Sequence, residues 1–203
     1  MLSILASAFT ISLAAAVAPG PITAVILAKS YRFKWSGLMV AAGSSLIETC
    51  LILLIFFGLA RFLQFEMFQL VLGIAGGIIL VMLGTMLLRR RKVSLNYTVD
   101  LPVSAFKLGV ITTLFNPVAL IWWATVGTYL ILRVSIYGIP GLLGIILAIE
   151  IPNFLWYSII SFLFHRYNYR WSAKLNTWLM VFFGLVLIAF GVFFTIESLV
   201  SYY

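Results

Sequence analysis

The stretch "AVAPGPITAV", residues 16–25, places two prolines and a glycine inside an apolar run that extends from Leu2 to Ala28. A proline within a helix lacks the N–H that bonds to the preceding turn, and its ring displaces the carbonyl four residues before it. We therefore predict a helix that breaks near Gly20. The break needs an explanation, because the run is long enough to cross a bilayer, which requires roughly 20 apolar residues.

The composition indicates that the whole chain is embedded in a membrane. Only 9% of the 203 residues are charged and 64% are hydrophobic, against roughly 25% and 45–50% in soluble domains. Six apolar runs fill nearly all of the chain: Leu2–Ala28, Ser36–Ala60, Phe68–Leu88, Leu108–Leu132, Gly138–Phe164 and Leu175–Ile196. Because helices satisfy their own backbone polar groups in lipid, we predict an all-α integral membrane protein with six transmembrane helices.

The basic residues are distributed unevenly between the connections. Eleven of the thirteen follow the first, third or fifth run, namely Lys29, Arg32, Lys34, Arg89, Arg90, Arg91, Lys92, Lys107, Arg166, Arg170 and Lys174. Arg61 and Arg133 belong to the opposite side. Basic residues in short loops stay in the cytoplasm, so we predict a multi-pass protein of the cell (plasma) membrane with both termini outside. A cleaved signal peptide is the alternative for the first run, although no basic region precedes it.

Three features recur in the same order in residues 1–88 and 105–199. They are a broken helix ("APGP", 18–21, and "FNP", 115–117), a single acid (Glu48 and Glu150) and two glycines seven residues apart (Gly77 with Gly84, and Gly184 with Gly191). Three helices per half place the halves in opposite orientations, which is the inverted-repeat plan of many transporters. We predict one transporter domain, 1–203, with repeats 1–88 and 105–199 and a cytoplasmic linker 89–104. Chance similarity between apolar segments is the alternative.

The two breaks are expected at matched depth. Gly20 lies nine residues before Lys29, and Asn116 lies nine residues after Lys107, which is roughly 13 Å along a helix. Half-helix ends at such breaks present N–H groups to anions and C=O groups to cations, which suits a zwitterion such as an amino acid. The predicted substrate-binding residues here are Pro19, Gly20, Pro21, Asn116 and Pro117. A proline kink that only shapes helix packing is the alternative interpretation.

The two intramembrane acids are the second candidate feature, because an ionisable side chain in the bilayer is costly and marks a functional site by default. Residues three or four apart share a helix face, which places Ser44 with Glu48, and Asn153 and Tyr157 with Glu150. We predict that Ser44, Asn153 and Tyr157 bind substrate and that both glutamates exchange protons. In the alternative interpretation, each glutamate is neutral and only hydrogen-bonds a neighbouring helix.

Three motifs follow one another along the chain: "APGPITAVILAKSYRFKWSGLMVAAGSSLIE" (18–48), "FNPVALIWWATVG" (115–127) and "PNFLWY" (152–157). Together they resemble the first-repeat signature, the fourth-helix motif and the fifth-helix pattern of the lysine exporter (LysE) superfamily of amino-acid exporters. The resemblance implies proton-motive export of amino acids or related small solutes, including zwitterionic ones. It also implies a transport path lined by Pro19, Gly20, Pro21, Glu48, Asn116 and Pro117. The two predicted repeats separately suggest alternating access around a site at the two breaks, with a glutamate returning a proton.

The sequence departs from the family pattern at three positions, which leaves the substrate open. Val118 stands where many members have Lys, Ser44 where some have His, and Asn153 where an acid is frequent. Some branches of the family move ions, so an exporter of metal or other inorganic ions is the alternative function. A metal site would be expected to offer His, Cys or clustered carboxylates, whereas His165 and Cys50 are isolated in the sequence.

Other classes of protein have less support. The sequence lacks the HExxH, Gly-x-Ser-x-Gly and phosphate-loop motifs, so we expect no enzymatic activity, no cofactor and no resident metal. The net charge of +8 follows from the topology, so we expect no nucleic-acid partner. The expected partners are a small-molecule substrate, protons and the lipid bilayer. The glycine spacings in the third and sixth runs also suit a homodimer contact.

Overall fold

A computed structural model describes residues 1–58, 66–90, 103–168 and 173–202. Over these ranges the chain is helical and contains no strand. The elements are α1 (Leu2–Val17), α2 (Pro21–Ser30), α3 (Ser36–Phe56), α4 (Glu66–Arg90), α5 (Ala105–Leu114), α6 (Pro117–Trp122), the π-helical turn η2 (Trp123–Gly127), α7 (Thr128–Ser135), α8 (Gly138–Asn168) and α9 (Ala173–Tyr202). The predicted all-α class is confirmed for this part of the chain.

Three helices among the described residues are long and apolar enough to cross a membrane alone: α3, α8 and the Val181–Val200 part of α9. Two bent pairs of helices qualify together, α1 with α2 and α5 with Ala119–Ser135. Five of the six predicted runs therefore correspond to candidate spans. The remaining run falls in α4, where the apolar helix Gly73–Arg89 is shorter than a full span.

The first bend lies where the sequence predicts a break. α1 ends at Val17, Ala18 and Gly20 are extended, and Pro21 is the first residue of α2. The axes of α1 and α2 differ by 62°. Proline is favoured at the first helical position because its missing N–H would have no intrahelical acceptor there. Pro21 therefore starts a new helix in a new direction, which is more than a kink within one helix.

The second bend has the same construction and nearly the same angle, 63°. α5 ends at Leu114, and Pro117 is the first residue of α6. Asn116 caps α6, because its Oδ1 accepts a hydrogen bond from the Ala119 N–H at 3.3 Å. Asparagine is a preferred N-cap residue for this reason. The motif "FNP" thus encodes both the end of one half-helix and the start of the next.

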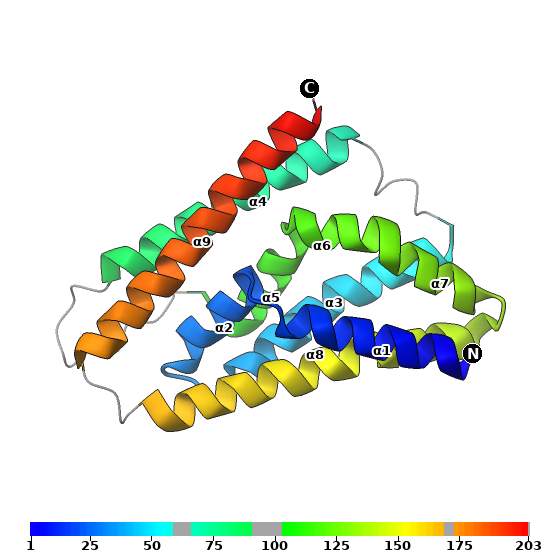
Figure 1. Cartoon of the computed structure of the whole chain (residues 1–203), viewed down its shortest axis with the longest axis horizontal. Coiled ribbons are helices and arrows are strands. Elements are labelled where there is room, and N and C mark those ends of the chain that lie inside the picture. Colours follow the sequence, from blue (N-terminus) through cyan, green and yellow to red (C-terminus); the bar gives the residue numbers. More distant parts are fainter. Residues whose placement is uncertain (59–65, 91–102, 169–172, 203) are drawn as a thin grey trace.

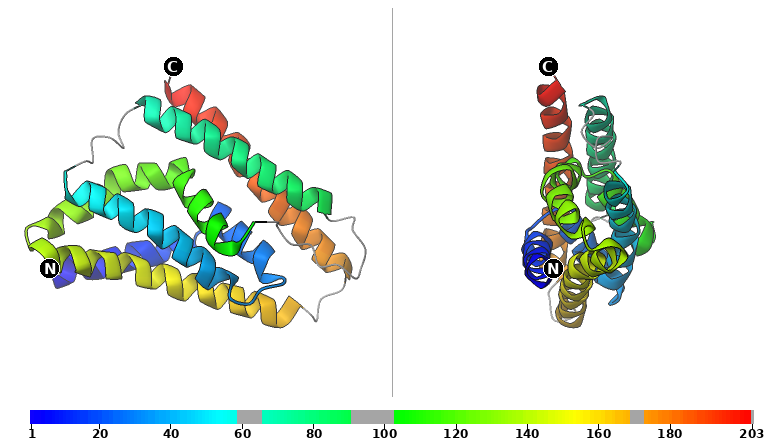
Figure 2. Two further views of the ribbon diagram at one scale, coloured as in Figure 1. Left: turned by 180° about the vertical axis from the view of Figure 1, so that it is seen from behind. Right: turned by 90° about the vertical axis from the view of Figure 1, so that its right-hand side faces the viewer.

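The helices of the two halves pack in corresponding ways. α1 packs along α8, α5 packs along α3, and α3 contacts α8. α4 and α9 lie side by side along one edge of the bundle (Figures 1 and 2). One hydrophobic cluster joins α2, α4, α5, α9 and the end of α1 to one half of α3, and a second joins the rest of α1, α6, η2 and α7 to the other half of α3. α8 contributes to both clusters.

The C-terminal ends of α2, α4 and α8 lie on the same side of the molecule, on the left in Figure 1. Each precedes one of the basic connections of the sequence. The cytoplasmic location of this end stays a prediction, and most of the predicted linker 89–104 lies outside the described residues.

The α4–α9 interface is built on glycines, which allow close approach of two helices. A Cβ at Gly84 would lie 2.6 Å from the Gly184 carbonyl oxygen, and one at Gly77 would lie 2.6 Å from that of Gly191. We expect Gly84→Ile to separate α4 from α9 and to lower the monodisperse fraction in size-exclusion chromatography. Met82→Ile is the matched control, since Met82 is exposed. A normal elution profile for Gly84→Ile would contradict this assignment.

Candidate functional site

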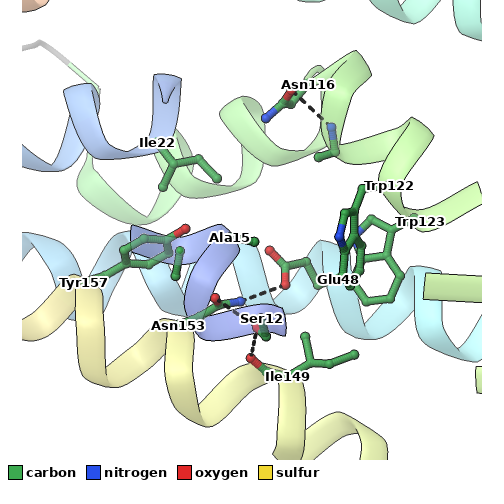
Figure 3. A pocket seen from close by; sticks show the side chains of 12 residues that line it. Ser12, Ala15, Ile22, Glu48, Asn116, Trp122, Trp123, Ile149, Asn153 and Tyr157 are labelled. Atoms are coloured by element: carbon green, nitrogen blue, oxygen red, sulfur yellow. Dashed lines mark hydrogen bonds between the residues drawn. The ribbon is translucent and has the colours of Figure 1, made fainter. Parts of the chain in front are cut away.

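A cavity of about 190 Å³ lies beside the two helix breaks. Twelve residues line it: Ser12, Ala15, Ala16, Ile22, Glu48, Asn116, Ala119, Trp122, Trp123, Ile149, Asn153 and Tyr157. They come from α1, α2, α3, α6, η2 and α8, together with the α6 cap. Figure 3 shows the carboxylate of Glu48 between Asn153 on one side and the rings of Trp122 and Trp123 on the other. The cavity thus joins a polar face to an aromatic one.

Glu48 is held by two hydrogen bonds from different helices. Its Oε1 accepts from the Ser44 hydroxyl at 2.7 Å, and its Oε2 accepts from the Asn153 amide at 3.0 Å. The Ser44 hydroxyl also lies 2.7 Å from Oγ1 of Thr113 on α5. Hydrogen bonds to an ionised carboxylate are stronger than neutral ones. Glu48 on α3 is therefore connected to α8 directly, through Asn153, and to α5 through Ser44.

Asn153 extends this network to α1. Its Oδ1 lies 3.4 Å from the Ser12 hydroxyl, which donates to the Ile149 carbonyl at 2.8 Å. Ser12 is 3% exposed and Asn153 is 7% exposed, so the network is shielded from solvent. Buried polar networks of this kind fix the relative positions of the elements that they join.

Glu150 has a different environment from Glu48. It is 6% exposed, it is not among the residues that line the cavity, and neither of its carboxylate oxygens has a hydrogen-bond partner within the described residues. A buried charge without a partner is costly. The interface of α3 and α8 thus holds one partnered and one unpartnered acid.

The structure brings together some of the predicted site residues and leaves others apart. Four of them line the cavity, namely Glu48, Asn116, Asn153 and Tyr157. Ser44 is not among the lining residues but donates a hydrogen bond to Glu48. The three residues of the first break, Pro19, Gly20 and Pro21, are not among the lining residues, whereas the next residue, Ile22, is. Pro117 opens α6, and its side chain lies outside the described part of the chain.

Sequence reasoning did not identify Ser12 or the π-helical turn. Ser12 lies at four-residue spacing from Ala8 and Ala16, which indicates a small-residue helix face but not a hydrogen bond. Just after η2, the hydroxyl of Thr128, the first residue of α7, donates to the Trp123 carbonyl, five residues earlier, at 2.8 Å. The rings of Trp122 and Trp123 meet edge to face at 4.9 Å. Isolated π-turns are frequent at functional sites, but no sequence rule located this one.

Comparison with known proteins identifies the family to which the chain belongs. A family model described as LysE type translocator matches residues 13–198, which include both breaks and most of the cavity. A search of curated proteins found no match, and a search of solved structures found none either. The chain therefore belongs to the LysE type translocator family and is a multi-pass membrane protein that transports a solute.

Proposed function

We propose that this protein is a secondary active transporter, with no enzymatic activity, that exports amino acids or related small zwitterionic solutes. The observation that carries the proposal is the cavity at the two breaks, in which a hydrogen-bonded acid faces two tryptophan rings. Substrate sites of transporters with inverted repeats lie where broken helices meet.

We propose further that the two halves are inverted repeats that rock around this cavity. The support is the matched pair of bends, 62° and 63°, and the corresponding packing of α1 on α8 and α5 on α3. The cavity is bordered by residues of both repeats, such as Glu48 of the first and Asn153 of the second. Movement of one repeat against the other would open the cavity to alternate sides of the membrane.

The half-helix ends supply groups of both signs to a zwitterion. Ala15 and Ala16, in the last turn of α1, line the cavity, and Ile22 lines it from the first turn of α2. The end of a helix offers carbonyl oxygens and negative potential, whereas its start offers N–H groups and positive potential. The break at residues 18–21 therefore faces a ligand with both polarities.

Export is tested with purified protein in liposomes loaded with a mixture of amino acids. We expect selective efflux that empty liposomes do not show. If no amino acid leaves while the protein is demonstrably folded, the proposed substrate class is wrong. Loading the same liposomes with divalent metal salts then tests the alternative, an ion exporter.

Coupling to protons is assigned to Glu48 and Glu150 together. We expect an acidic exterior to stimulate amino-acid efflux in the wild type, because each unit of pH difference supplies about 1.4 kcal/mol per proton. Glu150→Gln is expected to lose this stimulation while retaining exchange of labelled for unlabelled substrate, since glutamine keeps the size of the side chain but carries no titratable proton. The measurement is efflux at equal and unequal pH across the liposome membrane.

Glu197→Gln is the matched control for that experiment. Glu197 also has a buried carboxylate oxygen without a hydrogen-bond partner in the part of the chain that the structure describes, but it lies on α9 and does not line the cavity. The control is expected to keep the wild-type response. An undiminished response to the pH difference in Glu150→Gln would remove Glu150 from the coupling mechanism.

A further inference from the structure

We infer that the cavity recognises its ligand through an ammonium group placed at Glu48, and that a ligand carboxylate is dispensable for binding. The inference rests on the proposed function of the cavity as a solute-binding site, and it identifies the ammonium group as the part of the ligand that the site binds. Small primary amines without a carboxylate are therefore ligands.

The ionisable acidic and basic side chains of the lining are all of one sign. Among the twelve lining residues Glu48 is the one acid, and none is Lys, Arg or His. The buried Lys29 lies seven residues beyond Ile22, in the last turn of α2. An acid in a buried site favours a cationic partner, since an uncompensated buried charge is costly. A bound carboxylate would meet no cationic side chain from these lining residues.

The carboxylate of Glu48 keeps capacity for such a partner. Each of its oxygens accepts one hydrogen bond, from Ser44 and from Asn153 respectively. A carboxylate has about four acceptor positions in total, so positions are left for an ammonium group. Figure 3 shows the carboxylate pointing toward Ala15, in the last turn of α1. The carbonyl end of that helix adds negative potential at the same place.

The aromatic wall also favours a cation. Trp122 and Trp123 both line the cavity beside Glu48, and their ring planes are 85° apart. The two rings contact each other edge to face, with their centroids 4.9 Å apart. A cation over the face of tryptophan is attracted by the ring quadrupole, whereas an anion gains no such attraction. The acid and the aromatic wall therefore select the same sign of charge.

The test uses two probes with the same apolar part, isobutylammonium chloride and sodium isovalerate. The thermal unfolding midpoint, Tm, of the purified full-length chain in detergent is measured with each salt at millimolar concentration, with sodium chloride as the baseline. A ligand that binds the folded state raises Tm. We expect isobutylammonium to raise Tm by about 2 °C or more and isovalerate to leave it unchanged.

Two variants locate the effect. Glu48→Gln is expected to lose the shift with isobutylammonium, and Glu197→Gln, on α9 outside the cavity, is expected to keep it. A shift with isovalerate as large as that with the amine would overturn the inference. So would retention of the amine shift in Glu48→Gln. If that variant does not fold, the wild-type comparison of amine with acid still decides the question.

The efflux and Tm experiments together distinguish a failure of the ammonium inference from a failure of the proposed transport function. Efflux of amino acids without any amine-induced shift in Tm overturns the ammonium inference and leaves the transporter proposal standing. An amine-induced shift without amino-acid efflux supports recognition of ammonium at Glu48 and counts against amino acids as the exported solute.

Discussion

Replacing Glu48 with glutamine is expected to abolish export while leaving a folded protein in the membrane. Glutamine has nearly the same size, but its amide accepts through one oxygen only, so either Ser44 or Asn153 loses its acceptor. A hydrogen bond to a charged group contributes roughly 1.5–3 kcal/mol, and each 1.4 kcal/mol is a factor of ten. We therefore expect efflux to fall at least about tenfold, with a further loss from the missing charge.

The measurement is initial efflux from liposomes that contain equal amounts of wild-type and variant protein. Glu197→Gln serves again as the control, because it removes an acid from α9 without touching the cavity network. Equal elution profiles in detergent establish that the variants are folded. Wild-type efflux from Glu48→Gln would show that the cavity acid has no part in transport.

Replacing Gly109 with alanine is expected to destabilise the protein strongly, although the change adds only one methyl group. A Cβ at Gly109 would lie 2.1 Å from the carbonyl oxygen of Val40, and one at Gly43 would lie 2.1 Å from that of Phe106. Both obstacles are backbone atoms, so the methyl group fits only if α3 and α5 move apart. Overpacking of this kind costs about 1–3 kcal/mol or more.

Moving α3 and α5 apart would also disturb the candidate functional site. The 2.7 Å contact between Ser44 and Thr113 crosses the α3–α5 interface, and Ser44 is a donor to Glu48. We expect the Gly109→Ala protein to aggregate or to unfold at a Tm lower by several degrees, as measured by fluorescence during heating.

Gly20→Ala is the matched control for this prediction. An added Cβ at Gly20 would have its nearest contact at 4.0 Å, and its φ of −161° is extended backbone that alanine adopts. This variant is expected to fold with wild-type stability. Equal stability of Gly109→Ala and Gly20→Ala would show that the close approach of α3 and α5 is not essential.

The class of protein, the family resemblance and the places of the helix breaks can all be predicted from the order of the amino acids alone. The class follows from composition, because 64% hydrophobic and 9% charged residues are too many and too few, respectively, for a soluble domain. The breaks follow from local chemistry, because Pro21 and Pro117 cannot donate to the preceding turn and are suited to the first position of a helix. These properties depend on residues near one another in the chain.

Which of the candidate residues contact one another depends on how the helices pack in three dimensions. Helical spacing groups Glu150 with Asn153 and Tyr157, yet Asn153 and Tyr157 line the cavity whereas Glu150 is absent from its lining and has no hydrogen-bond partner among the described residues. Periodicity relates residues within one helix but does not state which helix each face meets. Asn153 reaches Glu48 from 105 residues away, and such contacts are set by the packing of separate helices.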